Sequence, residues 1–153
     1  MKTILNINGK DYTAEFSEGE KLDKILRRLG FLSVKHSCNS MDCGTCTVLI
    51  DGKPVLSCGT FAASATGKKI ETVESLSKNE KLHPLQEALL EENGAQCGFC
   101  IPGFELTAKA LLEKIPHPNE EEIRSYMKGN LCRCTGYERQ HQAIMKASKK
   151  TGE

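Results

Sequence analysis

The stretch that decides the fold is Cys38-Asn-Ser-Met-Asp-Cys43-Gly-Thr-Cys46, followed after a short predicted hairpin by Cys58. Three thiols this close together require a tight loop that turns their sulfurs toward one point. The fourth thiol reaches the same point only if the intervening strands run out and back around a sharp turn. Asp51-Gly52 predicts such a turn, because Asp-Gly pairs favour the type I′ hairpin conformation. We therefore expect one compact site made of four sulfurs.

The spacing of these cysteines, C-x4-C-x2-C and then a distant fourth, is the one by which plant-type ferredoxins hold a [2Fe-2S] cluster. Zinc is the weaker interpretation here, because three cysteines in one loop of this length do not match a zinc-ribbon knuckle. The chain is therefore predicted to carry electrons through one [2Fe-2S] cluster bound by the first quartet, Cys38, Cys43, Cys46 and Cys58.

Strand and helix patterns around the first quartet predict a β-grasp, plant-type ferredoxin-like domain. Residues 3–16 read as a hairpin around an Asn-Gly turn, and residues 22–29 place leucine and isoleucine at helical spacing before a glycine. Residues 47–50 and 53–57 form a second predicted hairpin, and residues 69–73 a last strand. These elements suffice for one small sheet covered by one helix.

The second half of the chain predicts helices in place of strands. Four short helices are expected: one opening at Pro84, one after Cys100, one capped by Asn119 and one from about Glu138. The overall fold class is therefore α+β, with a four-helix bundle after the ferredoxin-like domain. We place the domains at residues 1–76 and 77–153, because residues 76–82 are polar and show the apolar spacing of neither a helix nor a strand.

The second half also carries a second quartet of cysteines: Cys97, Cys100, Cys132 and Cys134. Each pair precedes a predicted helix, so pairing of those two helices would bring their amide-rich, positive ends around the sulfurs. Such donors stabilise a reduced, anionic centre, so a second [2Fe-2S] cluster is chemically sensible. Structural zinc on four thiolates remains an alternative. A thioredoxin-like disulfide is disfavoured, because no strand precedes Cys97 as in a βαβ unit.

Composition excludes several classes of function. Lys and Arg number 21 against 20 Asp and Glu, so a net charge of +1 gives no reason to expect a nucleic acid or membrane partner. No secretory leader or membrane-length apolar run is present, which favours a cytoplasmic protein with reduced thiols over a disulfide framework. The four histidines lack metal-ligand spacing, and no nucleophile triad, phosphate loop or carboxylate pair is evident. We therefore expect no catalytic residues on this chain.

The motifs together resemble those of the small iron-sulfur subunit of the molybdenum hydroxylases. That family includes xanthine dehydrogenase, aldehyde oxidoreductase, nicotinate dehydrogenase, aerobic carbon monoxide dehydrogenase and 4-hydroxybenzoyl-CoA reductase. The similarity spans almost the whole chain and is carried by these segments: the first-quartet loop, Asp51-Gly52, Ser57-Cys58, Leu82-His-Pro-Leu-Gln86, Gln96-Cys-Gly-Phe-Cys100, Pro102-Gly103 and Gly129-Asn-Leu-Cys-Arg-Cys-Thr-Gly-Tyr137.

The resemblance implies a relay between two larger partners. A large subunit would hold a molybdopterin-type molybdenum cofactor and act on an N-heterocycle, an aldehyde or a related small substrate. A medium subunit would hold FAD, and the three chains would form a heterotrimer or a dimer of heterotrimers. The first cluster would lie nearer FAD and the second nearer molybdenum, with Gln96 and Cys134 close to the pterin.

Two positions depart from the family pattern. Ser37 and Met41 stand where relatives usually carry glycine, so the first-quartet loop is expected to differ locally or to shield its cluster with the Met41 side chain. Two other functions stay open at this point. One is a free-standing two-cluster ferredoxin, and the other is a zinc-stabilised interaction module.

Overall fold

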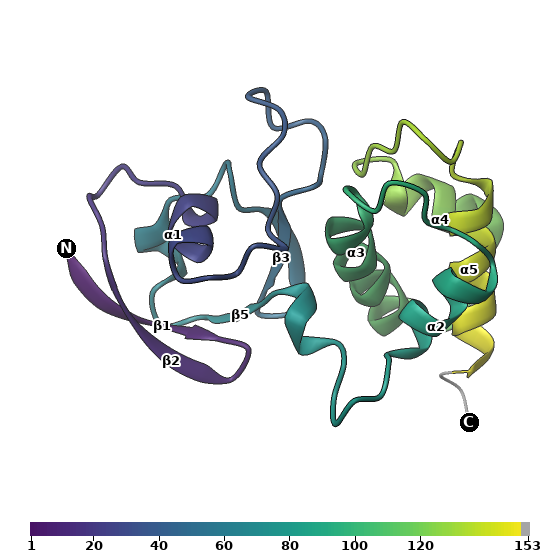
Figure 1. Ribbon diagram of the computed structural model, residues 1–153, viewed down its shortest axis with the longest axis horizontal. Coiled ribbons are helices and arrows are strands. Elements are labelled where there is room, and N and C mark those ends of the chain that lie inside the picture. Colours follow the sequence, from purple (N-terminus) through teal and green to yellow (C-terminus); the bar gives the residue numbers. More distant parts are fainter. Residues whose placement is uncertain (151–153) are drawn as a thin grey trace.

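The computed structural model describes residues 1–150 and contains a sheet half and a helical half that lie side by side (Figure 1). The sheet has the strand order β2-β1-β5-β3-β4. β1 runs parallel to β5, and the other neighbours are antiparallel. The strands are β1 (Lys2–Ile7), β2 (Lys10–Glu15), β3 (Thr47–Ile50), β4 (Lys53–Leu56) and β5 (Lys69–Glu71).

The sheet half follows the sequence prediction except in its last strand, which ends at Glu71 instead of residue 73. Both hairpins turn on residue pairs with positive φ, Asn8-Gly9 and Asp51-Gly52, which is the type I′ geometry. Helix α1 (Leu22–Arg28) buries Leu22, Ile25 and Leu26 in one core with the buried residues of β1. Two short 3₁₀ helices, η1 (Ala62–Ala65) and η2 (Val73–Ser75), were not indicated by the sequence patterns.

The helical half consists of α2 (Pro84–Glu91), α3 (Ile101–Lys114), α4 (Glu120–Met127) and α5 (Glu138–Lys150). The predicted capping box of α4 is confirmed, since Asn119 and Glu122 each accept a hydrogen bond from the other's backbone N–H. A second box between His83 and Gln86 begins α2. Phe104, Leu111, Ile123 and Ile144 are fully or almost fully buried in the helical core. The α+β class and the ferredoxin-then-helices order are therefore confirmed.

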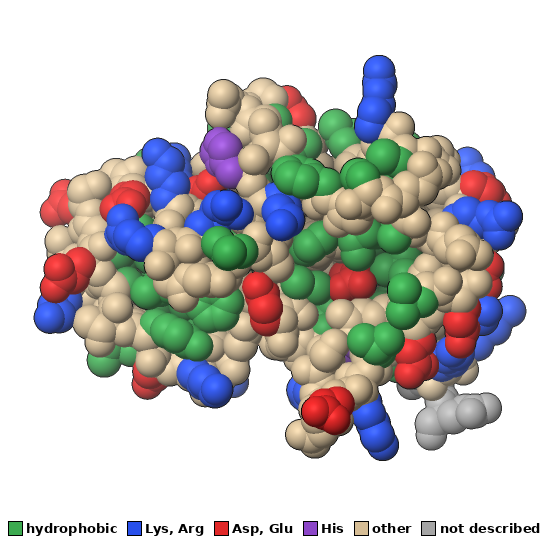
Figure 2. Space-filling model, viewed as in Figure 1, with side chains coloured by type: hydrophobic (Ala, Val, Ile, Leu, Met, Phe, Trp, Pro, Cys, Tyr) green, Lys and Arg blue, Asp and Glu red, His purple; other side chains and the backbone are tan. Residues whose placement is uncertain are grey.

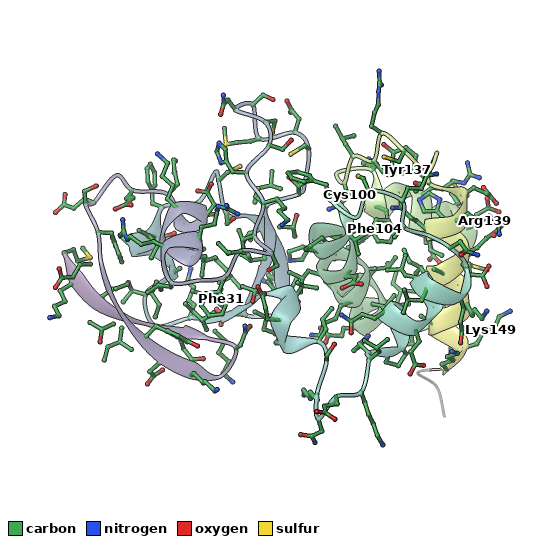
Figure 3. All side chains as sticks on the ribbon, in the orientation of Figure 1. Phe31, Cys100, Phe104, Tyr137, Arg139 and Lys149 are labelled. Carbon is green, nitrogen blue, oxygen red and sulfur yellow. The ribbon has the colours of Figure 1, made fainter. Side chains whose placement is uncertain are left out.

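The helices pair differently from the simplest expectation. Helix α5 packs chiefly against α2, whereas α3 packs against β3 and α4. The N-terminal ends of α3 and α5 nevertheless lie at the same end of the bundle (Figure 3). Their placement, rather than their direct pairing, therefore brings the second-quartet cysteines together.

Contact between the two halves is made mainly by α3 and β3. Leu49 of β3 and Leu76 pack with Leu106 and Ala110 of α3 in a small core separate from the other two. Lys109 of α3 also bridges to Glu71 of β5 at 3.2 Å. Within residues 1–150, no helix combines the length and the apolar character needed to cross a bilayer.

A buried carboxyl on α3 makes stability depend on pH. Glu105 is 6% exposed, and Gln86 Nε2 donates to its Oε2 at 3.3 Å. Burial raises the pKa of Glu105 to about 7, although the Gln86 hydrogen bond opposes that shift. Because the folded state binds this proton more tightly than the unfolded state, stability should fall as pH rises from the ordinary carboxyl pKa of 4.5 through about 7, and it should level off above that.

Glu105→Gln should remove that loss. Between pH 6 and 8.5 the wild type should lose roughly 1 kcal/mol of unfolding free energy relative to the variant. Denaturant titrations at both pH values measure it, with Glu121→Gln on the exposed side of α4 as the control. A difference that does not change with pH would contradict the assignment.

Two candidate iron-sulfur sites

The first quartet is carried by the loop between α1 and β3, with Cys38, Cys43 and Cys46, and by the segment after β4, with Cys58. The Cys46 and Cys58 sulfurs lie 3.2 Å apart. The Cys38 and Cys43 side chains are hydrogen-bonded to each other. The four sulfurs therefore meet as two pairs.

The surroundings of the first quartet favour a thiolate at Cys38 and disfavour one at Cys58. Backbone N–H groups of Cys43 and Asp42 point at Cys38 and lower the pKa of its thiol to about 6. Burial, followed by the neighbouring Cys46 thiol, raises the pKa of Cys58 to about 12. Two adjacent thiolates in such a place repel each other, so a cationic metal core is what would hold both deprotonated.

The second quartet lies at the end of the bundle where α3 and α5 begin (Figure 3). The Cys97 and Cys134 sulfurs are 3.6 Å apart, and Cys100 and Cys132 form the other pair. Cys97 and Cys134 are exposed, whereas Cys100 and Cys132 are partly covered. This quartet therefore also meets as two pairs, one of them at the surface.

Side-chain donors surround the inner pair of the second quartet. Burial would raise the pKa of Cys132, but hydrogen bonds from the Thr135 hydroxyl and backbone outweigh it and lower the pKa to about 7. Thr135 Oγ1 donates to Cys132 Sγ at 3.1 Å. Burial, followed by Cys132, raises the pKa of Cys100 to about 11. Gln140 Nε2 donates to Cys100 Sγ at 3.6 Å.

Paired sulfurs fit a two-iron core. In a [2Fe-2S] cluster held by four cysteines, each iron takes two thiolates, so the ligands come in two pairs. A structural zinc instead gathers all four thiolates around one ion. Each quartet thus has the donor set and the pairing that a [2Fe-2S] cluster requires.

A backbone hydrogen bond joins the two quartets. Leu131 N–H donates to the Cys43 carbonyl at 2.9 Å, and Leu131 directly precedes Cys132. Asn130 Nδ2 donates to the neighbouring Gly44 carbonyl at 3.2 Å. Cys43 and all four second-quartet cysteines also line one cavity of about 390 Å³. The two sites are therefore adjacent across the contact between the halves.

Met41 and Gln96 occupy the outer edges of the sites. Met41 keeps the left-handed conformation, with φ 61°, which costs a non-glycine residue about 1 kcal/mol. Its Sδ lies against Gly59, the residue after Cys58, and its side chain is 53% exposed. Gln96 is exposed next to Cys97, at the surface end of the second quartet.

Three side chains that hydrogen-bond to sulfur were missed by the motif analysis: Thr45, whose hydroxyl lies 3.2 Å from Cys43 Sγ, Thr135 and Gln140. The two threonines carry no signal beyond their closeness to a cysteine in sequence. Gln140 does carry one, because residues 140, 143, 144 and 147 follow helical spacing and only the first of them is polar.

Comparison with known families assigns each half of the chain to a [2Fe-2S] domain family. The family described as "2Fe-2S iron-sulfur cluster binding domain" matches residues 5–77, and the family described as "[2Fe-2S] binding domain" matches residues 72–145. The nicotinate dehydrogenase small FeS subunit of Eubacterium barkeri is 44% identical over 92% of this chain and 90% of its own length. The chain belongs to the small iron-sulfur subunit family of the molybdenum hydroxylases.

Solved structures agree with that membership. A chain of quinoline 2-oxidoreductase from Pseudomonas putida 86 superposes with a TM-score of 0.95 at 42% identity, covering 99% of this subunit and 94% of that chain. The aldehyde oxidoreductase of Megalodesulfovibrio gigas is 39% identical over 97% of the subunit, but the match covers only 17% of that longer protein. The iron-sulfur subunit is thus an electron-transfer component with two [2Fe-2S] domains and forms part of a larger oxidoreductase.

Proposed function

We propose that this subunit relays single electrons between a molybdenum cofactor on a large subunit and FAD on a medium subunit. The first quartet would hold one [2Fe-2S] cluster and the second quartet another, in domains 1–76 and 77–153, of which residues 151–153 lie outside the described part. When bound, each cluster supplies one-electron redox chemistry. The chain itself would carry no substrate-transforming site and would work in the cytoplasm.

The observation that carries this proposal is the 2.9 Å hydrogen bond from Leu131 N–H to the Cys43 carbonyl. It links a residue of the first quartet to the neighbour of Cys132 through backbone atoms alone. Protein atoms packed between two redox centres hold them at a fixed short separation and exclude bulk water from the space between. The bond therefore supports transfer within the chain from one quartet to the other.

Two exposed surfaces, one beside each quartet, support two partners. Phe99 and Leu131 are 43% and 49% exposed and line the cavity beside the second quartet. Hydrophobic side chains also gather on the face between the halves in Figure 2. Phe61, which is 50% exposed beneath Lys21, and Met41 form a second apolar surface near Cys58. Exposed apolar groups next to a redox site fit docking of a protein partner.

In this arrangement the large subunit would cover Gln96 and Cys134, which lie at the exposed end of the second quartet. There the Gln96 amide and the Cys134 backbone could meet a pterin. The medium subunit would cover the Cys58 end. The likeness to a nicotinate dehydrogenase subunit and to quinoline 2-oxidoreductase favours a small N-heterocycle or aldehyde as the substrate of the large subunit.

Metal analysis and EPR test the proposal. The purified chain should contain about four irons and four acid-labile sulfides, and dithionite reduction should produce two distinct S = 1/2 signals. Purification at native expression level should recover two larger chains that carry molybdenum and flavin. Zinc without sulfide would overturn the cluster assignment, and a stable lone monomer that reduces diverse acceptors would favour a free carrier.

A further inference from the structure

Gln140 is a polar side chain in an otherwise apolar position. It is 0% exposed and lies in the first turn of α5. The residues that follow it on the same buried face are also 0% exposed: Ala143, Ile144 and Ala147. An apolar residue of similar volume would fill this place without any hydrogen-bonding demand. A buried amide at this position therefore requires a hydrogen-bond partner.

The partnering of this amide is incomplete. Gln140 Oε1 is buried and has no hydrogen-bond partner among residues 1–150. A buried acceptor left unpaired is a net cost to stability. Packing and folding stability therefore do not account for this glutamine. The hydrogen bond that its amide makes is the one from Nε2 to Cys100 Sγ, at 3.6 Å.

The charge of the sulfur decides which way this amide points. Carbonyl and amino ends of a glutamine differ little in shape, so their assignment depends on the partner. A cysteine bound to iron is a thiolate, which accepts hydrogen bonds and cannot donate them. Only the orientation with N–H toward Cys100 is then attractive, and this is the orientation in the structure.

From these contacts we infer that Gln140 is a positioning residue that raises the reduction potential of the second centre by donating a hydrogen bond to Cys100. This inference rests on the proposed function, because it requires Cys100 to be a cluster ligand. Reduction adds negative charge that spreads onto the sulfur ligands, and a donor to sulfur stabilises the reduced form more than the oxidised form. Thr135 acts in the same way on Cys132, the other inner sulfur.

Two substitutions in the full chain, purified with the subunits that accompany it, test this inference. Gln140→Met keeps the length and much of the volume of the side chain but cannot donate a hydrogen bond. Gln140→Asn keeps the buried amide but is one methylene too short to reach Cys100 in the same way. The matched control is Gln142→Met, since Gln142 lies two residues further along the same helix, is exposed, and donates to Glu138 instead of a sulfur.

Redox titration followed by EPR gives the readout. Both Gln140 variants should favour the oxidised form of the second centre by about tenfold, which is about 59 mV for a one-electron couple. The first centre and the Gln142→Met protein should titrate like the wild type. Thr135→Val should shift the same signal as the Gln140 variants, which identifies it as that of the second centre.

The outcomes separate this inference from the proposed function. If the variants keep two signals and full iron content but the potential of the second centre is unchanged or higher, Gln140 has no tuning role, although the relay stands. If the wild-type chain holds no iron at the second quartet, both ideas fall. Should Gln140→Met fail to assemble the second centre, the titration of Gln140→Asn decides.

Discussion

Cys100→Ala is expected to abolish one of the two EPR signals of the reduced subunit and to cut its iron from about four to about two per chain. Cys100 and its pair partner Cys132 are both partly covered, and Gln140 donates a hydrogen bond to Cys100. Alanine leaves one iron with a single thiolate and opens that side of the core to water. The second cluster should therefore fail to assemble, while the first remains.

Cys58→Ala gives the reciprocal experiment. Cys58 pairs with Cys46 of the first quartet at 3.2 Å, so its loss should remove the other signal. All eight cysteines belong to one quartet or the other, so the two variants are matched controls for each other. Iron and sulfide assays with EPR of both proteins measure the result. Loss of the same signal in both would contradict the division into two quartets.

Local sequence chemistry was enough to predict most of the sheet half and the ends of the helices. Asn8-Gly9 and Asp51-Gly52 predict type I′ turns because both positions require positive φ, and the structure has it at all four residues. Asn119 predicts the start of α4 because its capping partner lies three residues away. Each of these features depends on a few neighbouring residues, so no knowledge of the tertiary fold was needed.

Features that depend on distant residues could not be predicted in this way. The amide of Asn130 and the carbonyl of Gly44 meet across 86 positions of sequence, and the bond from Leu131 to Cys43 depends on the same docking. Helical spacing places Phe104, Ala108 and Leu111 on one apolar face of α3 and gives no reason to expect Glu105 to be buried. Glu105 is buried because a second side of the helix lies against the sheet half. The packing of the two halves against each other decides such burial. The spacing of apolar residues along a helix or a strand does not encode it.

Gly44→Ala is expected to weaken that docking strongly. Gly44 has φ +72°, and a Cβ placed on it would lie 2.8 Å from Asn130 Nδ2 and 2.9 Å from Asn130 Cα, and closer still to the Gly129 carbonyl. The left-handed conformation alone costs alanine about 1 kcal/mol. Overpacking against backbone that cannot move cheaply adds to it, for a total loss of about 2–4 kcal/mol in unfolding free energy.

Gly67→Ala separates the two contributions. Gly67 has φ +75° but nothing within 4 Å of its would-be Cβ, so this variant should lose only the backbone part, about 1 kcal/mol. Denaturant unfolding of both proteins gives the difference that belongs to the contact between the halves.

The same contact carries the bond between Leu131 and Cys43, so Gly44→Ala should also slow electron transfer between the two centres. Rapid-freeze EPR, which follows how the signals appear one after the other, measures that rate, and Gly67→Ala should leave it unchanged. Equal losses of stability in the two variants, with equal transfer rates, would mean that close packing at Gly44 does not hold the quartets together. The path between them would then have to run through other atoms of the shared cavity.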